Sequence, residues 1–286
     1  MIKPFILGTC LILAASTSFA DWIRLGSWNI EHLGRMEDEA TGPKAIAEYV
    51  HLSGLDILAM QEIYDNDGVG ATKTNIQLNE AFEVLNQVAG HDWEYIMLPN
   101  KSSGDKSQLV AIAWNKDRVK KIGDELRISI NRQGNEWDRH PHAIKFQAGT
   151  GMTDIVVIPV HMKANYNGDF SEQRGLEAQA LIQALDSVKT EFDDEDIVII
   201  GDFNCGTTDE PAIQALLAEG YRDLNSRDGA THITWGPLDR ILVPGDEEFV
   251  FSRQYSLTAS DSEAFDRFLS DHQIVLTPIR ILDDDD

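Results

Sequence analysis

Cysteine is nearly absent from this chain of 286 residues, which contains only Cys10 and Cys205. Cys10 lies in an N-terminal stretch that we expect to be removed, and Cys205 would then have no partner for an intramolecular disulfide. An exported chain without disulfides depends for its stability on a hydrophobic core or on bound metal. With 42% hydrophobic and 25% charged residues, the composition is that of a globular protein long enough to form such a core.

Basic residues are also scarce, because 24 Lys and Arg stand against 48 Asp and Glu, which gives a formal net charge of −24. This acidity disfavours a broad electrostatic attraction to polyanions such as nucleic acids. It does not exclude phosphate chemistry, because a bound divalent cation inverts the local electric field.

Long apolar runs are missing after the first 20 residues, so no later stretch is expected to cross a membrane. At the N-terminus, Lys3 is followed by a short apolar run at residues 5–15 and by Ser-Phe-Ala at 18–20. This pattern predicts a secretory signal over residues 1–20, cleaved after Ala20. We therefore expect a secreted or periplasmic protein without stable membrane insertion. Loss of Lys3, with no acid in the signal, changes the net charge from −24 to −25.

The rest of the chain has no internal repeat, no low-complexity linker and no break in composition. We expect one domain over residues 21–282, a solvated acidic tail at 283–286, and a monomer. Strand-like and helix-like stretches alternate loosely, without the regular rhythm of a doubly wound fold. One α/β domain built on two sheets fits this pattern best.

The stretch at residues 196–204, D-I-V-I-I-G-D-F-N, is the most informative in the chain. Its four consecutive β-branched residues are typical of a strand buried on both faces. Asp202 and Asn204 follow this run, two residues apart, so on an extended backbone their side chains point the same way. The pattern predicts a carboxylate and a carboxamide projecting together from the end of a rigid strand. A simple turn is the alternative, because Asp and Asn also favour turns.

Other polar residues lie at or just beyond the ends of expected strands, namely Asn29, Glu62, His161, Asp239, Asp271 and His272. Strand ends in layered α/β folds converge on one rim, so these groups could meet in a single cleft. Glu62 and Asn29 offer hard oxygen donors, which suit Mg²⁺, Mn²⁺ or Ca²⁺ better than zinc. Taken singly, each of these residues could equally be a turn former, a cap or a solvated acid.

The order of these residues along the chain distinguishes the two interpretations. It runs W-N-I (28–30), Q-E (61–62), R-H-P (139–141), V-H (160–161), G-D-F-N (201–204), L-D-R-I-L-V (238–243) and S-D-H (270–272). This order closely resembles the endonuclease/exonuclease/phosphatase superfamily, and within it the deoxyribonuclease I-like nucleases. The resemblance covers nearly all of residues 22–280, and G-D-x-N with S-D-H is specific for the superfamily rather than for one substrate.

The resemblance implies a four-layer α/β/β/α sandwich, in which two mixed sheets pack face to face between helices. It also implies hydrolysis of a phosphate ester with a divalent metal, Mg²⁺ first and Mn²⁺ or Ca²⁺ as alternatives. The implied metal ligands are Glu62, Asn29 and Asp271, and the implied substrate-binding residues are Arg139 and Arg240. The implied catalytic residues are His161, Asp202, Asn204, Asp239 and His272.

The implied roles follow the chemistry of phosphodiester hydrolysis. His161 and His272 would flank the scissile phosphate, and Asp239 would pair with His272. Asp202 and Asn204 would position the attacking water, although the sequence does not decide which group is the general base. A phosphodiester is anionic, so its site must neutralise charge and align a water molecule, which a metal, an arginine and a carboxylate–histidine pair can do.

Two positions depart from the deoxyribonuclease I pattern. That family has a glutamate that partners the first histidine, whereas the similar stretch here is Met-Leu-Pro at residues 97–99, so His161 has no assigned partner. An arginine that contacts DNA in that family is replaced by Glu31.

Three functions remain open at this stage. The first is an exported endonuclease that cuts DNA, or RNA, with little sequence preference. The second is a lipid or inositol-phosphate phosphoesterase on the same scaffold. The third is a non-enzymatic binding protein, which is disfavoured because every acidic and histidine position of the pattern is retained.

Overall fold

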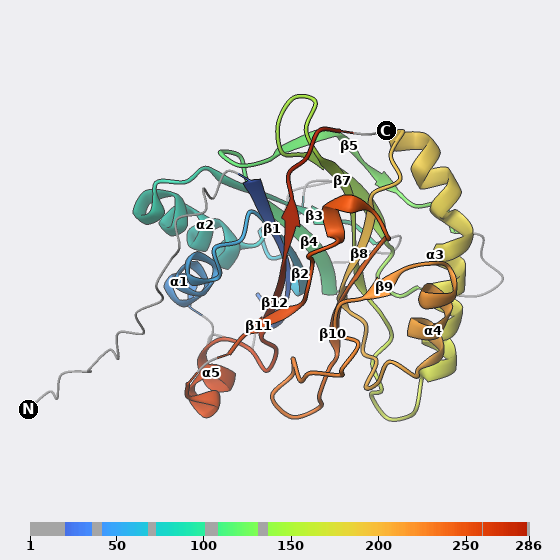
Figure 1. The fold of residues 1–286 in the computed structure, drawn as a ribbon. Helices are drawn as coiled ribbons and strands as arrows, with labels where there is room; N and C mark the ends of the chain where they lie inside the picture. The colour runs from blue at the N-terminus through green and yellow to red at the C-terminus, as the bar shows by residue number, and fades with distance from the viewer. Residues whose placement is uncertain are drawn as a thin grey trace, which may run out of the picture.

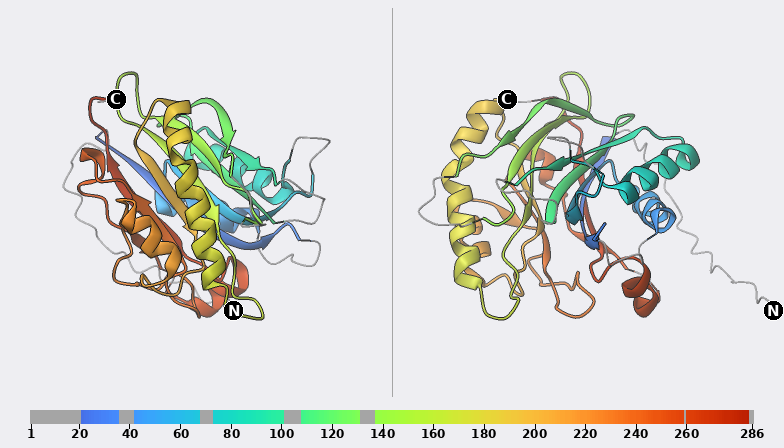
Figure 2. Two further views of the ribbon diagram at one scale, coloured as in Figure 1. Left: turned by 90° about the vertical axis from the view of Figure 1, so that its right-hand side faces the viewer. Right: turned by 180° about the vertical axis from the view of Figure 1, so that it is seen from behind.

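The computed structural model describes residues 21–35, 42–67, 73–100, 108–130, 137–258 and 260–284. The expected secretory signal at residues 1–20 lies outside them. Two six-stranded sheets pack face to face in the centre, and helices cover the outer face of each (Figures 1 and 2). The four-layer α/β/β/α sandwich of two mixed sheets is therefore confirmed.

The first sheet has the order β11-β12-β1-β2-β4-β3. Its strands are β1 (Trp22–Leu33), β2 (Ile57–Tyr64), β3 (Trp93–Leu98), β4 (Gln108–Asn115), β11 (Tyr255–Leu257) and β12 (Ile274–Arg280). β1 runs parallel to β2, and the other neighbours pair antiparallel.

The second sheet has the order β5-β6-β7-β8-β10-β9. Its strands are β5 (Lys120–Arg127), β6 (His142–Gln147), β7 (Asp154–His161), β8 (Ile197–Asp202), β9 (Arg222–Asp223) and β10 (Asp239–Val243). β7 and β8 are the parallel pair, and both are buried along their whole length. This burial on both faces explains the uninterrupted β-branched run that the sequence shows there.

The helices are α1 (Pro43–Ser53), α2 (Ile76–Ala89), α3 (Ser171–Phe192), α4 (Pro211–Ala218) and α5 (Ser262–Phe268), with a short 3-10 turn at Glu247–Phe249. α1 and α2 pack on the first sheet, and α3 and α4 pack on the second (Figure 1). No helix in the described part of the chain is both long enough and apolar enough to span a bilayer.

Alternation along the strands divides the core into three apolar layers. In β8, Ile197 and Ile199 face α3 and α4, whereas Val198 and Ile200 pack between the sheets. Each such side chain contributes roughly 1.5–3 kcal/mol when it is fully buried. The strand that carries the G-D-F-N motif is therefore fixed from both sides.

The strand directions bring the polar residues to one rim. The parallel pairs β1/β2 and β7/β8 end there, and the antiparallel neighbours β12 and β10 begin there. His161 lies beside Asp202 in the β7/β8 pairing, and Asp202 lies beside Asp239 in the β8/β10 pairing. Strand register thus brings His161, Asp202 and Asp239 together although they lie far apart in sequence.

Gly201 makes the closest approach at this rim. Its φ is +149°, and a Cβ at this position would lie 2.0 Å from the carbonyl oxygen of Val160 on β7. Any side chain here would force β7 and β8 apart. The glycine before Asp202 is therefore required for the spacing between His161 and Asp202.

At the other end of the chain, Asp283 forms an isolated bridge with Met152, and the Asp284 amide donates to the carbonyl oxygen of Gly151. Both aspartates are exposed. The expected acidic tail at 283–286 thus begins with backbone pairing, and its last two residues lie outside the described part.

Candidate active site

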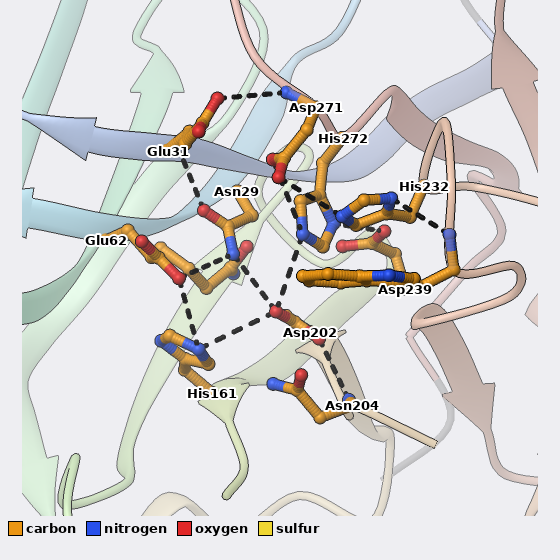
Figure 3. Close-up of polar contacts among 12 residues, drawn as sticks. Asn29, Glu31, Glu62, His161, Asp202, Asn204, His232, Asp239, Asp271 and His272 are labelled. Atoms are coloured by element: carbon orange, nitrogen blue, oxygen red, sulfur yellow. Dashed lines mark hydrogen bonds and ion pairs between the residues drawn. The ribbon is translucent and has the colours of Figure 1, made fainter. Parts of the chain in front are cut away.

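The rim collects polar side chains from both sheets around one centre, as Figure 3 shows. Asn29 and Glu62 lie on the first sheet, and Asp271 and His272 lie just before its strand β12. His161, Asp202 and Asp239 lie on the second sheet, and Asn204 lies just after its strand β8 (Figure 3). These are eight of the ten site residues predicted from the sequence. The other two, Arg139 and Arg240, have different surroundings.

Irregular backbone aims the side chains of the first sheet into the site. The pairing of β1 with β2 shifts register between Asn29 and Leu33, and that of β2 with β4 shifts between Met60 and Ile63. Glu62 lies in the second of these bulges with a φ of +62°, which is uncommon for a residue with a side chain. A bulge turns a side chain out of the regular alternation, and such strained positions concentrate at functional sites.

The Glu62 carboxylate is held by several side chains. Its Oε2 lies 2.8 Å from His32 Nδ1 and accepts a 2.8 Å hydrogen bond from Gln108 Nε2, and its Oε1 accepts from Asn29 Nδ2 at 3.2 Å. Burial alone would raise the pKa of Glu62, but the contacts with His32, His161 and Asn29 outweigh it and lower the pKa to about 2. Glu62 is therefore a permanent anion at neutral pH.

Asn29 joins the two sheets. Its Nδ2 donates to Glu62 and, at 3.0 Å, to Asp202 Oδ2 across the sheet interface. Its Oδ1 accepts from the backbone N–H of Glu31 at 3.0 Å, which fixes the orientation of the amide because a backbone N–H can only donate. In this arrangement the Asn29 amide nitrogen holds two carboxylates together, and its Oδ1 keeps a second lone pair, so Asn29 stays a predicted metal ligand.

Asp202 lies between the two site histidines. Its Oδ2 is 3.6 Å from His161 Nε2 and 3.9 Å from His272 Nε2, and its Oδ1 accepts from the backbone N–H of Asn204 at 2.8 Å. Burial raises the pKa of Asp202 to about 6, against the opposing charge of His272. A carboxylate with this pKa can take and release a proton near neutral pH.

The pKa values of the two site histidines are shifted in opposite directions. Burial opposes protonation of His272, but the carboxylates of Asp239 and Asp202 outweigh burial and raise its pKa to about 10. His272 Nδ1 lies 2.8 Å from Asp239 Oδ2, which also accepts from Thr231 Oγ1 at 2.7 Å. Burial, reinforced by the positive charge of Arg139, lowers the pKa of His161 well below its usual range. One imidazole is therefore cationic and the other neutral.

Unlike His272, His161 has no carboxylate at its Nδ1 within the described residues. Its buried Nδ1 makes no hydrogen bond with any residue in the described part of the chain. This agrees with the departure at residues 97–99, where the sequence lacks the expected glutamate.

The two predicted substrate-binding arginines differ in location. Arg139 lies close enough to His161 to lower its pKa, and its Nη2 donates to the Met162 carbonyl oxygen, to which Asn204 Nδ2 also donates. Its Nε, although buried, has no hydrogen-bond partner among the described residues. Arg139 is thus a cation at the edge of the site with a donor still unused.

Arg240 is fully buried and does not reach the site. Its Nη1 lies 2.5 Å from Asp223 Oδ2, and its Nη2 lies 2.7 Å from Asp228 Oδ1. Asp239 faces the site, and strand alternation places the next residue of β10 on the opposite face. The expected substrate contact of Arg240 is wrong on this geometry; the residue ties the loop at 223–228 to β10.

Four residues that contact the site groups were not identified from the sequence, namely His32, Gln108, Thr231 and His232. His32 and Gln108 both contact Glu62, and His232 Nε2 lies 3.1 Å from Asp271 Oδ2. Gln108 is the first residue of β4, whereas the other three lie in loops or irregular backbone, so their contacts follow from the three-dimensional pairing of strands, loops and bulges.

A family model described as "Endonuclease/Exonuclease/phosphatase family" matches residues 26–272, which contain the whole site. The chain belongs to the endonuclease/exonuclease/phosphatase family. Proteins of this family hydrolyse phosphoric esters and generally depend on a divalent metal, and this protein is a phosphoric ester hydrolase.

The proteins similar to this chain in sequence include deoxyribonucleases. The "Deoxyribonuclease" of Thioalkalivibrio sp. (strain K90mix) is 25% identical over 82% of this chain, which spans only 63% of that protein. "Deoxyribonuclease-1" of Canis lupus familiaris is 24% identical, with 93% of this chain and 95% of that protein covered.

Solved structures of the endonuclease/exonuclease/phosphatase family share the fold. A family member from Bacteroides thetaiotaomicron has a TM-score of 0.65 at 17% identity, with 92% of this chain and 95% of that one covered. A mannosyl-6-phosphatase from the same organism has a TM-score of 0.60 at 16% identity, with 89% and 98% covered.

Proposed function

We propose that this protein is an exported, divalent-metal-dependent phosphodiesterase that cuts DNA internally by in-line attack of water, with little sequence preference. RNA is the second nucleic-acid substrate to consider. The observation that carries the proposal is the position of Asp202 between the cationic imidazole of His272 and the neutral imidazole of His161. Two deoxyribonucleases among the relatives support DNA as the substrate.

The cations of the site suit a bound phosphate. His272 is held as an imidazolium by Asp239 and can donate from Nε2 to a phosphate oxygen or to the leaving oxygen. Arg139 carries a fixed charge and an unused buried donor, and it can bind a non-bridging oxygen. Both stabilise the charge that develops in the transition state.

Asp202 and Asn204 are placed to orient the attacking water. The Asn204 amide nitrogen donates to the Met162 carbonyl oxygen at 3.2 Å, and no hydrogen bond within the described residues occupies its Oδ1. That oxygen and Asp202 can both accept protons from one water molecule. With its pKa raised to about 6, Asp202 is the base that this geometry favours.

The donor set fits a hard divalent cation. Glu62 and Asp271 offer carboxylate oxygens, and the carboxylates of Asp202 and Asp239 lie in the same cluster (Figure 3). Oxygen ligands of this kind suit Mg²⁺, and also Mn²⁺ or Ca²⁺. When bound, the metal would neutralise phosphate charge and polarise the ester. We propose Mg²⁺, held by Glu62 and Asp271.

Export is proposed from the N-terminal 20 residues alone, whose basic start, short apolar run and small residues before Asp21 match a secretory signal. Cleavage after Ala20 would release a periplasmic or secreted enzyme. Determining the N-terminus of the mature protein by mass spectrometry tests this part separately.

A second candidate function is a phosphoesterase for a small or lipid-linked substrate, such as an inositol phosphate or sphingomyelin. The observation in its favour is charge, because the chain carries a net charge of −24 and Glu31 accepts a hydrogen bond from the Asp271 amide beside the site. An acidic rim repels a polyanion more than a small substrate. The mannosyl-6-phosphatase shows only that this fold accommodates such chemistry elsewhere.

The experiment is a comparison of substrates with purified mature protein. Supercoiled plasmid, RNA, sphingomyelin and inositol phosphates are each incubated with Mg²⁺ and with EDTA. We expect the parent protein to nick plasmid with Mg²⁺ but not with EDTA. The His272→Ala variant should lose this activity, and the His51→Ala variant, changed at an exposed histidine on α1, should retain it. Release of phosphate or phosphocholine without nicking would support the second candidate. Folded, metal-loaded protein that is inactive on every substrate would contradict both.

A further inference from the structure

His232 is a buried residue, 4% exposed, that neither the sequence pattern nor the proposed mechanism uses. It lies in the loop before β10, and its ring, the Asp271 carboxylate and the His272 ring place one potential ligand atom each within 4.8 Å of one another. Two imidazoles and a carboxylate at this spacing resemble a transition-metal site. His232 is thus either a metal ligand or a support for Asp271.

The hydrogen bonds to Nδ1 of His232 decide between these two roles. His232 Nδ1 accepts the backbone N–H of Thr234 at 2.9 Å and that of Trp235 at 3.2 Å. A backbone N–H can only donate, so Nδ1 carries the lone pair and the ring proton lies on Nε2. A nitrogen that bears a proton does not coordinate a metal. The turn at residues 232–235 therefore excludes His232 as a ligand and makes Nε2 a donor.

The acceptor within reach of this donor is Asp271. Its Oδ2 lies 3.1 Å from His232 Nε2, while its Oδ1 lies 3.8 Å from His272 Nε2 (Figure 3). His232 Nε2 forms no hydrogen bond within the described residues. The buried donor and the carboxylate therefore lie within hydrogen-bonding distance but are not hydrogen-bonded in this structure.

The surroundings leave His232 little freedom. Its ring stacks on Trp235 with centroids 4.7 Å apart, and it meets His272 edge to face at 4.6 Å. The backbones are also joined, because Ile233 donates to the Asp271 carbonyl oxygen at 2.9 Å and Gln273 donates to that of Thr231 at 2.8 Å. The donor and the carboxylate that it faces are therefore parts of one rigid unit.

We propose that His232 is a positioning residue that donates Nε2–H to Asp271 Oδ2, orients that carboxylate toward the catalytic centre and thereby raises the affinity of the site for its divalent cation. Outer partners of this kind fix the orientation of metal ligands and commonly change metal affinity by about 10–100-fold. The proposal rests on Asp271 being a metal ligand, as proposed above, but not on DNA being the substrate.

The test compares His232→Ala with His232→Gln, because the glutamine amide can place a donor where Nε2 lies. Binding of Mn²⁺ alone to the full chain is measured by calorimetry, with Asp271→Ala as the reference for loss of the ligand and His51→Ala as the matched control. We expect His232→Ala to bind Mn²⁺ about 10–100-fold more weakly and His232→Gln to stay within a few-fold of the parent protein.

A second readout follows turnover of bis(p-nitrophenyl) phosphate, a substrate that does not depend on nucleic-acid binding. For His232→Ala we expect a higher metal concentration at half-maximal rate and a nearly unchanged kcat at saturating metal. If the parent protein does not nick plasmid but the Mn²⁺ binding and the metal dependence of turnover are as expected, the nuclease proposal is contradicted and the role of His232 is retained.

A third readout is the ring tautomer. Nitrogen NMR of the parent protein without metal should place the His232 proton on Nε2. Any one of four results would overturn the proposal. These are a proton on Nδ1 of His232, Mn²⁺ binding weakened equally in His232→Gln and His232→Ala, unchanged Mn²⁺ binding in His232→Ala, and unchanged Mn²⁺ binding in Asp271→Ala. If His232→Ala fails to fold, the Gln variant and the tautomer still decide.

Discussion

His272 Nδ1 and Asp239 Oδ2 lie 2.8 Å apart, although they are 33 positions apart in the chain and Asp239 lies on the second sheet while His272 precedes β12 of the first. The pair keeps His272 protonated and aimed at Asp202. We expect Asp239→Asn to lower kcat by about two to four orders of magnitude, because an amide neither fixes the ring nor stabilises its charge. Thr231→Val removes the other hydrogen bond to the same oxygen and should cost much less. Equal losses in both variants would mean that the carboxylate only supports the loop.

Metal removal should abolish activity, and Glu62 should control metal affinity. We expect Mg²⁺ at 100 times its Kd to raise the free energy of unfolding of the parent protein by about 2.7 kcal/mol. The same Mg²⁺ concentration should give little increase in Glu62→Gln, because the amide lacks the charge of a carboxylate that is ionised at neutral pH. Chemical denaturation with Mg²⁺ and with EDTA measures both effects, and Glu80→Gln, an exposed glutamate on α2, is the control. Full Mg²⁺ stabilisation of Glu62→Gln would remove Glu62 from the ligand set.

Arg139 should act on the substrate rather than on stability. We expect Arg139→Lys to lower kcat/KM by about a hundredfold or more, because lysine keeps the charge but loses the planar fork of donors. Arg127→Lys, an exposed arginine on β5, serves as the control. Steady-state kinetics with plasmid and with bis(p-nitrophenyl) phosphate measures the loss, and near-parental kinetics would show that Arg139 only binds the Met162 carbonyl oxygen.

Arg240 should show the opposite behaviour. Arg240→Met leaves the buried carboxylate of Asp223 without its cation, and removal of one partner from such a pair typically costs about 3–5 kcal/mol. We expect urea denaturation to show a loss of this size, while kcat per folded molecule stays near that of the parent protein. A stable variant with low kcat would restore the substrate role that the sequence suggested.

Glu177 on α3 should make stability depend on pH. It is 1% exposed, and within the described residues its carboxyl group accepts a hydrogen bond only from the Lys163 backbone N–H. Burial raises its pKa from 4.5 to about 8. An acid with a raised pKa favours folding while it is protonated. Its contribution is complete below pH 4.5 and is lost as the pH rises toward 8, with a slope of at most about 1.4 kcal/mol per pH unit.

Glu177→Gln removes this titration. Relative to the parent protein, we expect the variant to become progressively more stable between pH 5 and pH 8, as measured by urea denaturation at several pH values. Glu191→Gln, an exposed glutamate near the end of the same helix, should follow the parent curve. Parallel curves for the parent protein and Glu177→Gln would show that Glu177 is ionised in the folded state throughout this range.

Much of the site could be predicted because its residues follow regular strands. Asp202 and His161 end buried runs whose periodicity is visible in the sequence, and parallel neighbours bring such ends together. The family resemblance added the pairing of Asp239 with His272. The four-layer arrangement also came from that resemblance, because periodicity alone does not say which sheet a strand joins.

The remaining features depend on geometry that no linear pattern carries. His32 reaches Glu62 through a bulge, and Gln108 reaches it from the start of a different strand. The amide of Asn29 faces the carboxylates because of one backbone donor at Glu31. Arg240 is the exception, since alternation along β10 was enough to place it opposite Asp239.

The catalytic groups come from both sheets, and an apolar cluster packs between those sheets, with the Asn29–Asp202 hydrogen bond crossing at the rim. Dispersion and hydrophobic contacts resist separation well but specify lateral position less strictly than directional bonds do, and a displacement of about 1 Å at a reacting centre can cost a hundredfold in rate. Warming or mild denaturant that lets one sheet slide on the other should therefore abolish turnover. Under the same conditions, circular dichroism should still show intact strands and helices. Inactivation would then precede unfolding, and the loss of activity would report a change in the relative position of the two sheets.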